Sequence, residues 1–195
     1  MKIKFIKAAL VGLVLSTSSL FNVANATLIN VALDGTASQS SLGAGGVASR
    51  AIDGNTSGIW GDGSITHTTG GSGTTNPFWI VDLGEEFLID SVTIWNRTDS
   101  CCTTRLDDAI IELFDSAMVL VAFYQGTGTF ASPDFTIGGN GFTAQFVQVR
   151  LEGQGRILSL AEVQVFSEVP EPAALALLGL GLVGLGLSRR KKAIR

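Results

Sequence analysis

The middle of the chain consists of short apolar or alternating stretches separated by glycine-rich segments. In residues 146–151, valine and leucine alternate with Gln148 and Arg150, and this period of two predicts a strand with one buried and one solvated face. Other stretches combine apolar with β-branched and aromatic residues, which strands favour. No stretch of the middle keeps a helical period, although a short helical turn is expected at Val47–Ile52. The predicted strands lie near 30–33, 37–41, 78–83, 88–95, 109–114, 119–124, 135–137, 145–151 and 159–166.

Many short strands with glycine turns predict an all-β protein of the jelly-roll β-sandwich class. The chain has 24 glycines, and they gather within 43–46, 70–73 and 138–141, where turns are expected. Trp79 and Trp95 lie in predicted strands. We expect both to pack in the core, because tryptophans in strands mostly do so.

Residues 1–26 have the three parts of a secretory signal peptide. Three lysines form the positive region, residues 8–15 form the apolar run, and Ala24-Asn25-Ala26 is a small-residue cleavage site. The apolar run is too short to span a membrane. We therefore expect export through the Sec pathway and a mature chain that begins near Thr27.

Residues 169–195 are also tripartite. Pro-Glu-Pro at 170–172 breaks regular structure, residues 173–187 are apolar, and five basic residues follow. On the residues alone this segment is either a plain membrane anchor, with its charges on the cytoplasmic side, or a processed sorting signal. The pattern resembles the PEP-CTERM signal of Gram-negative bacteria. That resemblance implies recognition by an exosortase, transient or permanent anchoring in the inner membrane, and delivery to the cell surface or the extracellular matrix.

Charge is distributed unevenly along the chain. Residues 27–168 carry five arginines, no lysine and sixteen acidic residues, which gives a net charge of −11. Such a field repels phosphate backbones and anionic lipid headgroups, so nucleic acids and lipid surfaces are not expected partners. It favours bound cations such as calcium. The segment is about one domain in size and is long enough to bury a core.

The most concentrated polar chemistry lies in residues 96–106, with the only histidine, His67, upstream. Two arginines, an aspartate and the two adjacent cysteines suit a neutral ligand rich in hydroxyls, because arginine offers fixed hydrogen-bond donors. A structural interpretation is also open. In it, Arg97 pairs with Asp99, Arg105 pairs with Asp107 or Asp108 as weak exposed ion pairs, and the cysteines tighten a turn.

Five segments, together with Trp60, resemble the discoidin, or coagulation factor type C, superfamily of galactose-binding-like β-sandwiches. They cover nearly all of the segment 27–168. The segments are Asn30-Val31-Ala32-Leu33, Ala51-Ile52-Asp53-Gly54-Asn55, Phe78-Trp79-Ile80-Val81-Asp82-Leu83-Gly84, Ile89-Asp90-Ser91-Val92-Thr93-Ile94 and Leu160-Ala161-Glu162-Val163-Gln164-Val165.

Within that superfamily, the histidine, the Arg-x-Asp sequence, the paired cysteines and the second arginine look like the fucose-binding F-type lectins. The resemblance implies a disulfide between the two cysteines whose apolar flank packs on the sugar. One departure is Ser100, which stands between the aspartate and the cysteines where the lectins have no residue. The sugar-binding residues that the resemblance implies are His67, Arg97, Asp99, Cys101, Cys102 and Arg105.

The same resemblance implies a structural calcium site between the first loop and the last strand. Oxygen ligands from two loops suit this hard cation. Two of the residues would act through their main-chain carbonyls, namely Arg50 and Ala161. The side-chain ligands would come from Asp53, Asn55, Ser64 and Glu162.

These features lead us to expect a secreted or surface-displayed carbohydrate-binding module, for fucose-like or related sugars of exopolysaccharide or cell-surface glycans. An enzyme is not expected, because the sequence has a single imidazole and no Gly-x-Ser-x-Gly elbow, metal-spaced histidines or phosphate loop. The alternative is a structural or adhesion protein of the envelope or biofilm matrix that binds no sugar.

Overall fold

The structure is a computed structural model that describes residues 27–99, 101–126 and 134–169. Residues 28–168 form one compact unit. The expected signal peptide and the C-terminal sorting segment beyond Val169 lie outside the described residues. Among the residues that are described, no helix is both long and apolar enough to cross a membrane.

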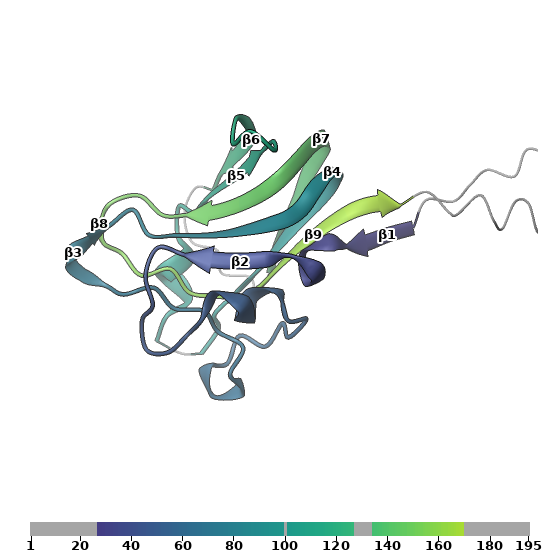
Figure 1. The fold of residues 1–195 in the computed structure, drawn as a ribbon. Coiled ribbons are helices and arrows are strands. Elements are labelled where there is room, and N and C mark those ends of the chain that lie inside the picture. Colours follow the sequence, from purple (N-terminus) through teal and green to yellow (C-terminus); the bar gives the residue numbers. More distant parts are fainter. Residues whose placement is uncertain (1–26, 100, 127–133, 170–195) are drawn as a thin grey trace, which may run out of the picture. The chain divides into compact units, whose positions relative to one another are not determined.

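Two long antiparallel strands organise the fold. They are β4 (Phe78–Asn96) and β7 (Asp134–Arg150), which run side by side over most of their length (Figure 1). The register of β4 shifts between Asp82 and Phe87 and again between Ile89 and Ser91. Such irregularities let a strand bend, so each long strand contributes its two halves to different parts of the sheet.

The remaining strands pair with one half or the other. The N-terminal half of β4 pairs with β2 (Thr36–Gln39), while the C-terminal half of β7 pairs with β5 (Ile110–Phe114), which pairs in turn with β6 (Leu120–Gln125). The C-terminal half of β4 pairs with β9 (Leu160–Val169), beside which lies β1 (Thr27–Asn30). A separate two-stranded sheet joins β3 (Gly71–Thr75) to β8 (Gln154–Gly155). This antiparallel architecture is the all-β class that the sequence predicts.

The buried faces of these strands form the hydrophobic core, and the alternation seen in the sequence explains which side chains of β7 belong to it. Val147, Val149 and Leu151 are fully buried while Gln148 and Arg150 reach solvent, as predicted. Trp79 is also fully buried, and its indole N–H donates to the carbonyl of Ala48 at 2.9 Å. This bond fixes the short 3-10 helix η2 (Ala48–Ile52), which occupies the predicted helical turn, against the core. The burial of apolar side chains in this core is the main contribution to the stability of the domain.

Several expectations about individual elements were wrong. The strand predicted at 30–33 ends at Asn30, because the Asn30 side chain accepts from the N–H of Ala32 at 3.2 Å and begins the 3-10 helix η1 (Val31–Asp34). The stretches 78–83 and 88–95 form one strand. Trp95 is only half-buried, and its indole N–H donates to Gln164.

Candidate functional site

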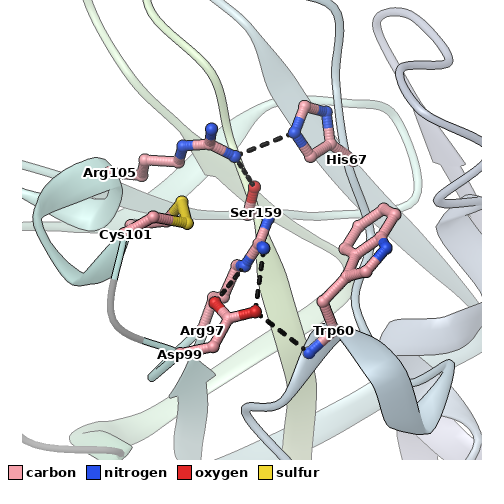
Figure 2. Close-up of a disulfide and its surroundings, with 8 residues drawn as sticks. Trp60, His67, Arg97, Asp99, Cys101, Arg105 and Ser159 are labelled. Carbon is pink, nitrogen blue, oxygen red and sulfur yellow. Dashed lines mark hydrogen bonds and ion pairs between the residues drawn. A yellow bond between two sulfur atoms is a disulfide. The ribbon is translucent and has the colours of Figure 1, made fainter.

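Arg97 lies directly after β4 and is held by a paired carboxylate. Its Nε and Nη2 donate to the two oxygens of Asp99, the second at 2.8 Å (Figure 2). Asp99 also accepts from the backbone N–H of Trp60 at 3.2 Å. The hydrogen bond from Arg97 is the main cause that lowers the pKa of Asp99, and the Trp60 N–H lowers it further. The guanidinium therefore keeps a fixed position, with its charge partly offset by Asp99.

Arg105 has a different kind of environment. It belongs to the 3-10 helix η4 (Thr103–Leu106), and its Nη1 lies 2.8 Å from Nε2 of His67 and 3.2 Å from the hydroxyl of Ser159. Among the described residues, no salt bridge involves Arg105. The pairing with Asp107 or Asp108 that the structural interpretation allowed is therefore not formed. The inserted Ser100 does not keep Arg105 away from the histidine.

The contacts of His67 define its tautomer. Its Nδ1 lies 2.7 Å from the carbonyl oxygen of Thr68, which can only accept, so Nδ1 carries the hydrogen. Nε2 then holds a lone pair and accepts from Arg105. Burial is the largest cause that lowers the pKa of His67, and the charges of Arg105 and Arg97 lower it further, while the bond to Thr68 acts in the opposite direction. The ring is therefore neutral at pH 7.

Trp60 is a site residue that the sequence pattern did not assign. It begins the 3-10 helix η3 (Trp60–Asp62), and its ring lies 4.9 Å from Cζ of Arg97 and edge-on to His67, with 5.6 Å between ring centres. Figure 2 shows these side chains pointing toward one another. A tryptophan in a polar glycine-rich loop has no strand to pack in, and this was the available signal. Ser159, which contacts Arg105, is a second site residue that the sequence pattern did not assign, and nothing in its sequence surroundings marks it.

Backbone hydrogen bonds from two segments hold the histidine loop. The N–H groups of Thr66 and Thr68 donate to the carbonyls of Leu160 and Leu158, at 2.8 and 3.0 Å. On the other side, the N–H of Gly43 donates to the His67 carbonyl at 2.7 Å, and the His67 N–H donates to Gly46 at 2.9 Å. The glycine-rich segment 43–46 thus lies directly against His67. A Cβ on Gly43 would stand 2.6 Å from Nδ1 of that ring, so a side chain there would displace it.

Cys101 and Cys102 are joined by a disulfide in the structure. Cys101 is exposed and lies beside Arg105, whereas Cys102 is buried (Figure 2). The carboxylate of Asp99 lies within 4.8 Å of both sulfurs. The three groups do not make a metal centre, because metals bind cysteine as thiolate and Asp99 is already engaged by Arg97. The bonded sulfurs present an apolar surface at the edge of the site.

Glu162, one of the candidate calcium residues, is fully buried on β9. Its Oε1 accepts from the N–H of Gly54 at 3.1 Å, and its Oε2 has no hydrogen-bond partner among the described residues. Burial raises the pKa of this carboxyl to about 7, and the charge of Asp53 contributes to the rise, while the Gly54 N–H opposes it. A buried carboxylate loses hydration when it is ionised, and either a proton or a nearby positive charge compensates for that loss.

The other candidate calcium residues occupy nearby segments. Asp53 accepts from the N–H of Asn55 at 2.9 Å in the turn that contacts Glu162. The buried Ser64 donates its hydroxyl to the carbonyl of Ser57. Ala161 is buried next to Glu162 on β9. The side chain of Arg50 donates to the carbonyl of Ile65 at 3.1 Å.

Comparison with known proteins agrees with this architecture. Residues 50–149 match the F5/8 type C family model described as NedA-like, galactose-binding domain. Fucolectin-1 of Anguilla japonica is 37% identical over 187 residues, which cover 87% of this chain and 99% of the relative. The chain belongs to the F5/8 type C, galactose-binding-like family. Residues 168–191 of this F5/8 type C protein also match the PEP-CTERM protein-sorting motif.

Solved structures show the same similarity. A fucose binding module of Streptococcus pneumoniae is 33% identical with a TM-score of 0.67, over 74% of this chain and 99% of that one. An F-lectin from striped bass serum is 31% identical with a TM-score of 0.61, over 73% of this chain and 48% of that one. The family resemblance inferred from the sequence is therefore confirmed.

We predict that Gly58→Ala disturbs the site of this F5/8 type C domain, whereas Gly61→Ala in the same loop does not. A Cβ on Gly58 would stand 2.9 Å from the carbonyl oxygen of Asn96 and would also meet the hydroxyl of Thr98, while nothing lies within 4 Å of one on Gly61. Thermal melting should show a loss of about 1–3 kcal/mol for Gly58→Ala. Equal melting temperatures for the two variants would contradict the close approach.

We also predict that His67 titrates below its ordinary value of 6.5 and carries its hydrogen on Nδ1. Long-range proton–nitrogen NMR spectra of the imidazole report both properties. Arg105→Gln should raise the pKa of His67, because it removes a neighbouring positive charge. Arg150→Gln is the control, since Arg150 pairs with Glu112 and Glu152 instead. A hydrogen on Nε2 would contradict the assignment.

Proposed function

We propose that this protein is a carbohydrate-binding module and that it binds a neutral, fucose-like sugar between Arg97, His67 and Arg105. The observation that carries the proposal is the neutral imidazole flanked by two guanidinium groups, beside the exposed Cys101 of the disulfide and a tryptophan. Its similarity to fucolectins and to a fucose binding module supports the same ligand class.

The donors of the site suit sugar hydroxyls. Asp99 occupies Nε and Nη2 of Arg97, so Nη1 keeps its hydrogens for a ligand. Arg105 uses Nη1 for His67 and Ser159, which leaves Nε and Nη2. Charge-assisted bonds from a fixed guanidinium contribute about 1.5–3 kcal/mol each. Because these donors are held before the ligand arrives, little conformational entropy is lost on binding.

Apolar surface complements these donors. Trp60 and the Cys101–Cys102 disulfide lie around the arginines and offer hydrophobic contact to a ring face or a methyl group. A 6-deoxy sugar such as fucose combines hydroxyls with a methyl group, and it therefore matches both kinds of surface.

The C-terminal motif supports display outside the cell. A PEP-CTERM motif indicates export, and we propose that an exosortase recognises it and that the domain is presented at the cell surface or in the exopolysaccharide matrix. We expect a single site for one sugar residue to bind its ligand weakly. Many copies displayed together would raise the overall avidity without any new contact.

We predict that Arg97→Ala reduces binding of L-fucose by roughly 10- to 100-fold, the equivalent of one or two charge-assisted bonds. Isothermal titration of the full chain in mild detergent measures the affinity, and a glycan array tests other sugars. Arg150→Ala serves as the matched control, because Arg150 bonds Glu112 on β5. Undiminished binding by Arg97→Ala would overturn the proposed site. Binding of no glycan would favour the structural role in the envelope.

We further propose that calcium binds at Glu162, held by the side chains of Asp53, Asn55 and Ser64 and by main-chain carbonyls of Arg50 and Ala161. Oε2 of Glu162 is buried and has no hydrogen-bond partner within the described part of the chain, which supports this choice. A divalent cation would compensate for the two carboxylates and connect the turn at Gly54 to β9.

We predict that calcium raises the melting temperature at pH 8 and that chelation lowers it. Without calcium, the folded state retains a proton on Glu162 between pH 4.5 and about 7, so stability falls as pH rises through this window. With calcium this fall should disappear. Glu162→Gln should abolish the calcium response, whereas the exposed Glu152→Gln should retain it. A melt that does not respond to calcium would contradict the proposal.

A further inference from the structure

A surface hollow shares one residue, Arg105, with the proposed sugar site. It has a volume of about 270 Å³ and is lined by Thr104, Arg105, Gly155, Arg156 and Ile157. Arg105 belongs to both places, because the same guanidinium also contacts His67 and Ser159. A ligand that occupied the sugar site could therefore extend into this hollow.

Both arginines that line the hollow lack a salt bridge among the residues that the structure describes. Arg156 donates from Nη2 to the main-chain carbonyl of Asp107 at 2.6 Å, and its longer contacts, at 3.5 Å, are with the carbonyls of Arg105 and Glu152. Carbonyls are neutral, so these bonds orient the guanidinium without balancing its charge. In the described part of the chain, the salt bridges engage Arg97 and Arg150 and include neither Arg105 nor Arg156.

This local charge contrasts with the rest of the domain. Residues 27–168 carry a net charge of −11 and only five arginines. Glu152 precedes the hollow's residues Gly155 and Arg156 in the sequence, and its carboxylate accepts a hydrogen bond from Arg150 at 2.9 Å. Burial lowers the pKa of Arg105, and the negative charge of Asp99 acts on it from a distance in the opposite direction, but Asp99 is itself hydrogen-bonded to Arg97. Arg105 and Arg156 both line the hollow, and two positive side chains in an acidic domain give this place a local attraction for an anion.

We propose that the Arg105–Arg156 hollow is a subsite for an anionic substituent, a sulfate or a carboxylate, on the sugar next to the one held by Arg97 and His67. Arginine's planar fork suits both groups, and the exposed Thr104 adds a hydroxyl donor. This inference rests on the proposed sugar binding. It makes acidic glycans the preferred ligands of a domain whose overall charge would otherwise repel them.

The test compares three probes on the full chain in mild detergent. They are a neutral fucosylated oligosaccharide, the same oligosaccharide with one sulfate, and the same with one sialic acid carboxylate. At low salt, at least one anionic probe should bind on the order of tenfold more tightly than the neutral one. This advantage should shrink as salt is raised, because salt screens charge. The arm with the larger advantage identifies sulfate or carboxylate as the preferred group.

Variants separate this subsite from the first one. Arg156→Gln should remove the anionic advantage and leave the affinity for the neutral probe unchanged, which also shows that the variant is folded. Arg156→Lys should restore part of the advantage, and Arg150→Gln should keep all of it. Equal binding of the three probes overturns the anionic subsite while the proposed function stands. If none of the three probes binds, both the anionic subsite and the proposed function are overturned. If the anionic advantage persists in Arg156→Gln, the role of Arg156 is overturned.

Discussion

The site depends on the hydrogen bond between the guanidinium of Arg105 and the neutral ring of His67. A protonated ring could not accept this bond and would place a second positive charge against the guanidinium. The carbonyl of Thr68 prevents the wrong tautomer by fixing the hydrogen on Nδ1. Because the ring is neutral, the arginine is held in place while its charge and its other donors stay available. A carboxylate in place of the histidine would have cancelled that charge.

The strand β4 connects this site to the core. Its first half buries Trp79 in the core, and Arg97 follows its last residue, Asn96. Since nineteen residues form one strand, the position of Arg97 is set by the packing of the whole sandwich rather than by its own loop. The loop that carries Trp60 is attached to this strand end, because the N–H of Thr98 donates to the carbonyl of Gly58 at 2.9 Å.

The sequence predicted the parts of this arrangement that depend on pattern or on chemical type. Alternation identified the strand that buries Val147 and Val149, and the residue types pointed to the arginines and to His67. It did not predict which group each arginine would contact, because partners such as Ser159 are brought in by long-range pairing. It also placed a break in β4 near Gly84, whose φ of +87° is accommodated at a bulge rather than at a chain turn.

The two candidate sites share one loop. At one end of this loop, the N–H of Gly54 donates to the carboxylate of Glu162. At the other end, the N–H of Trp60 donates to the carboxylate of Asp99. Both acceptors are carboxylates, yet their environments differ. Arg97 lowers the pKa of Asp99, so that end is secured by an ionised group at neutral pH, whereas burial raises the pKa of Glu162 to about 7. The end at Glu162 is therefore the weaker attachment, because ionising this carboxylate costs free energy unless a cation is present. Any cation held there would order the loop that positions Trp60, and sugar affinity and cation affinity would then rise together, as linkage requires.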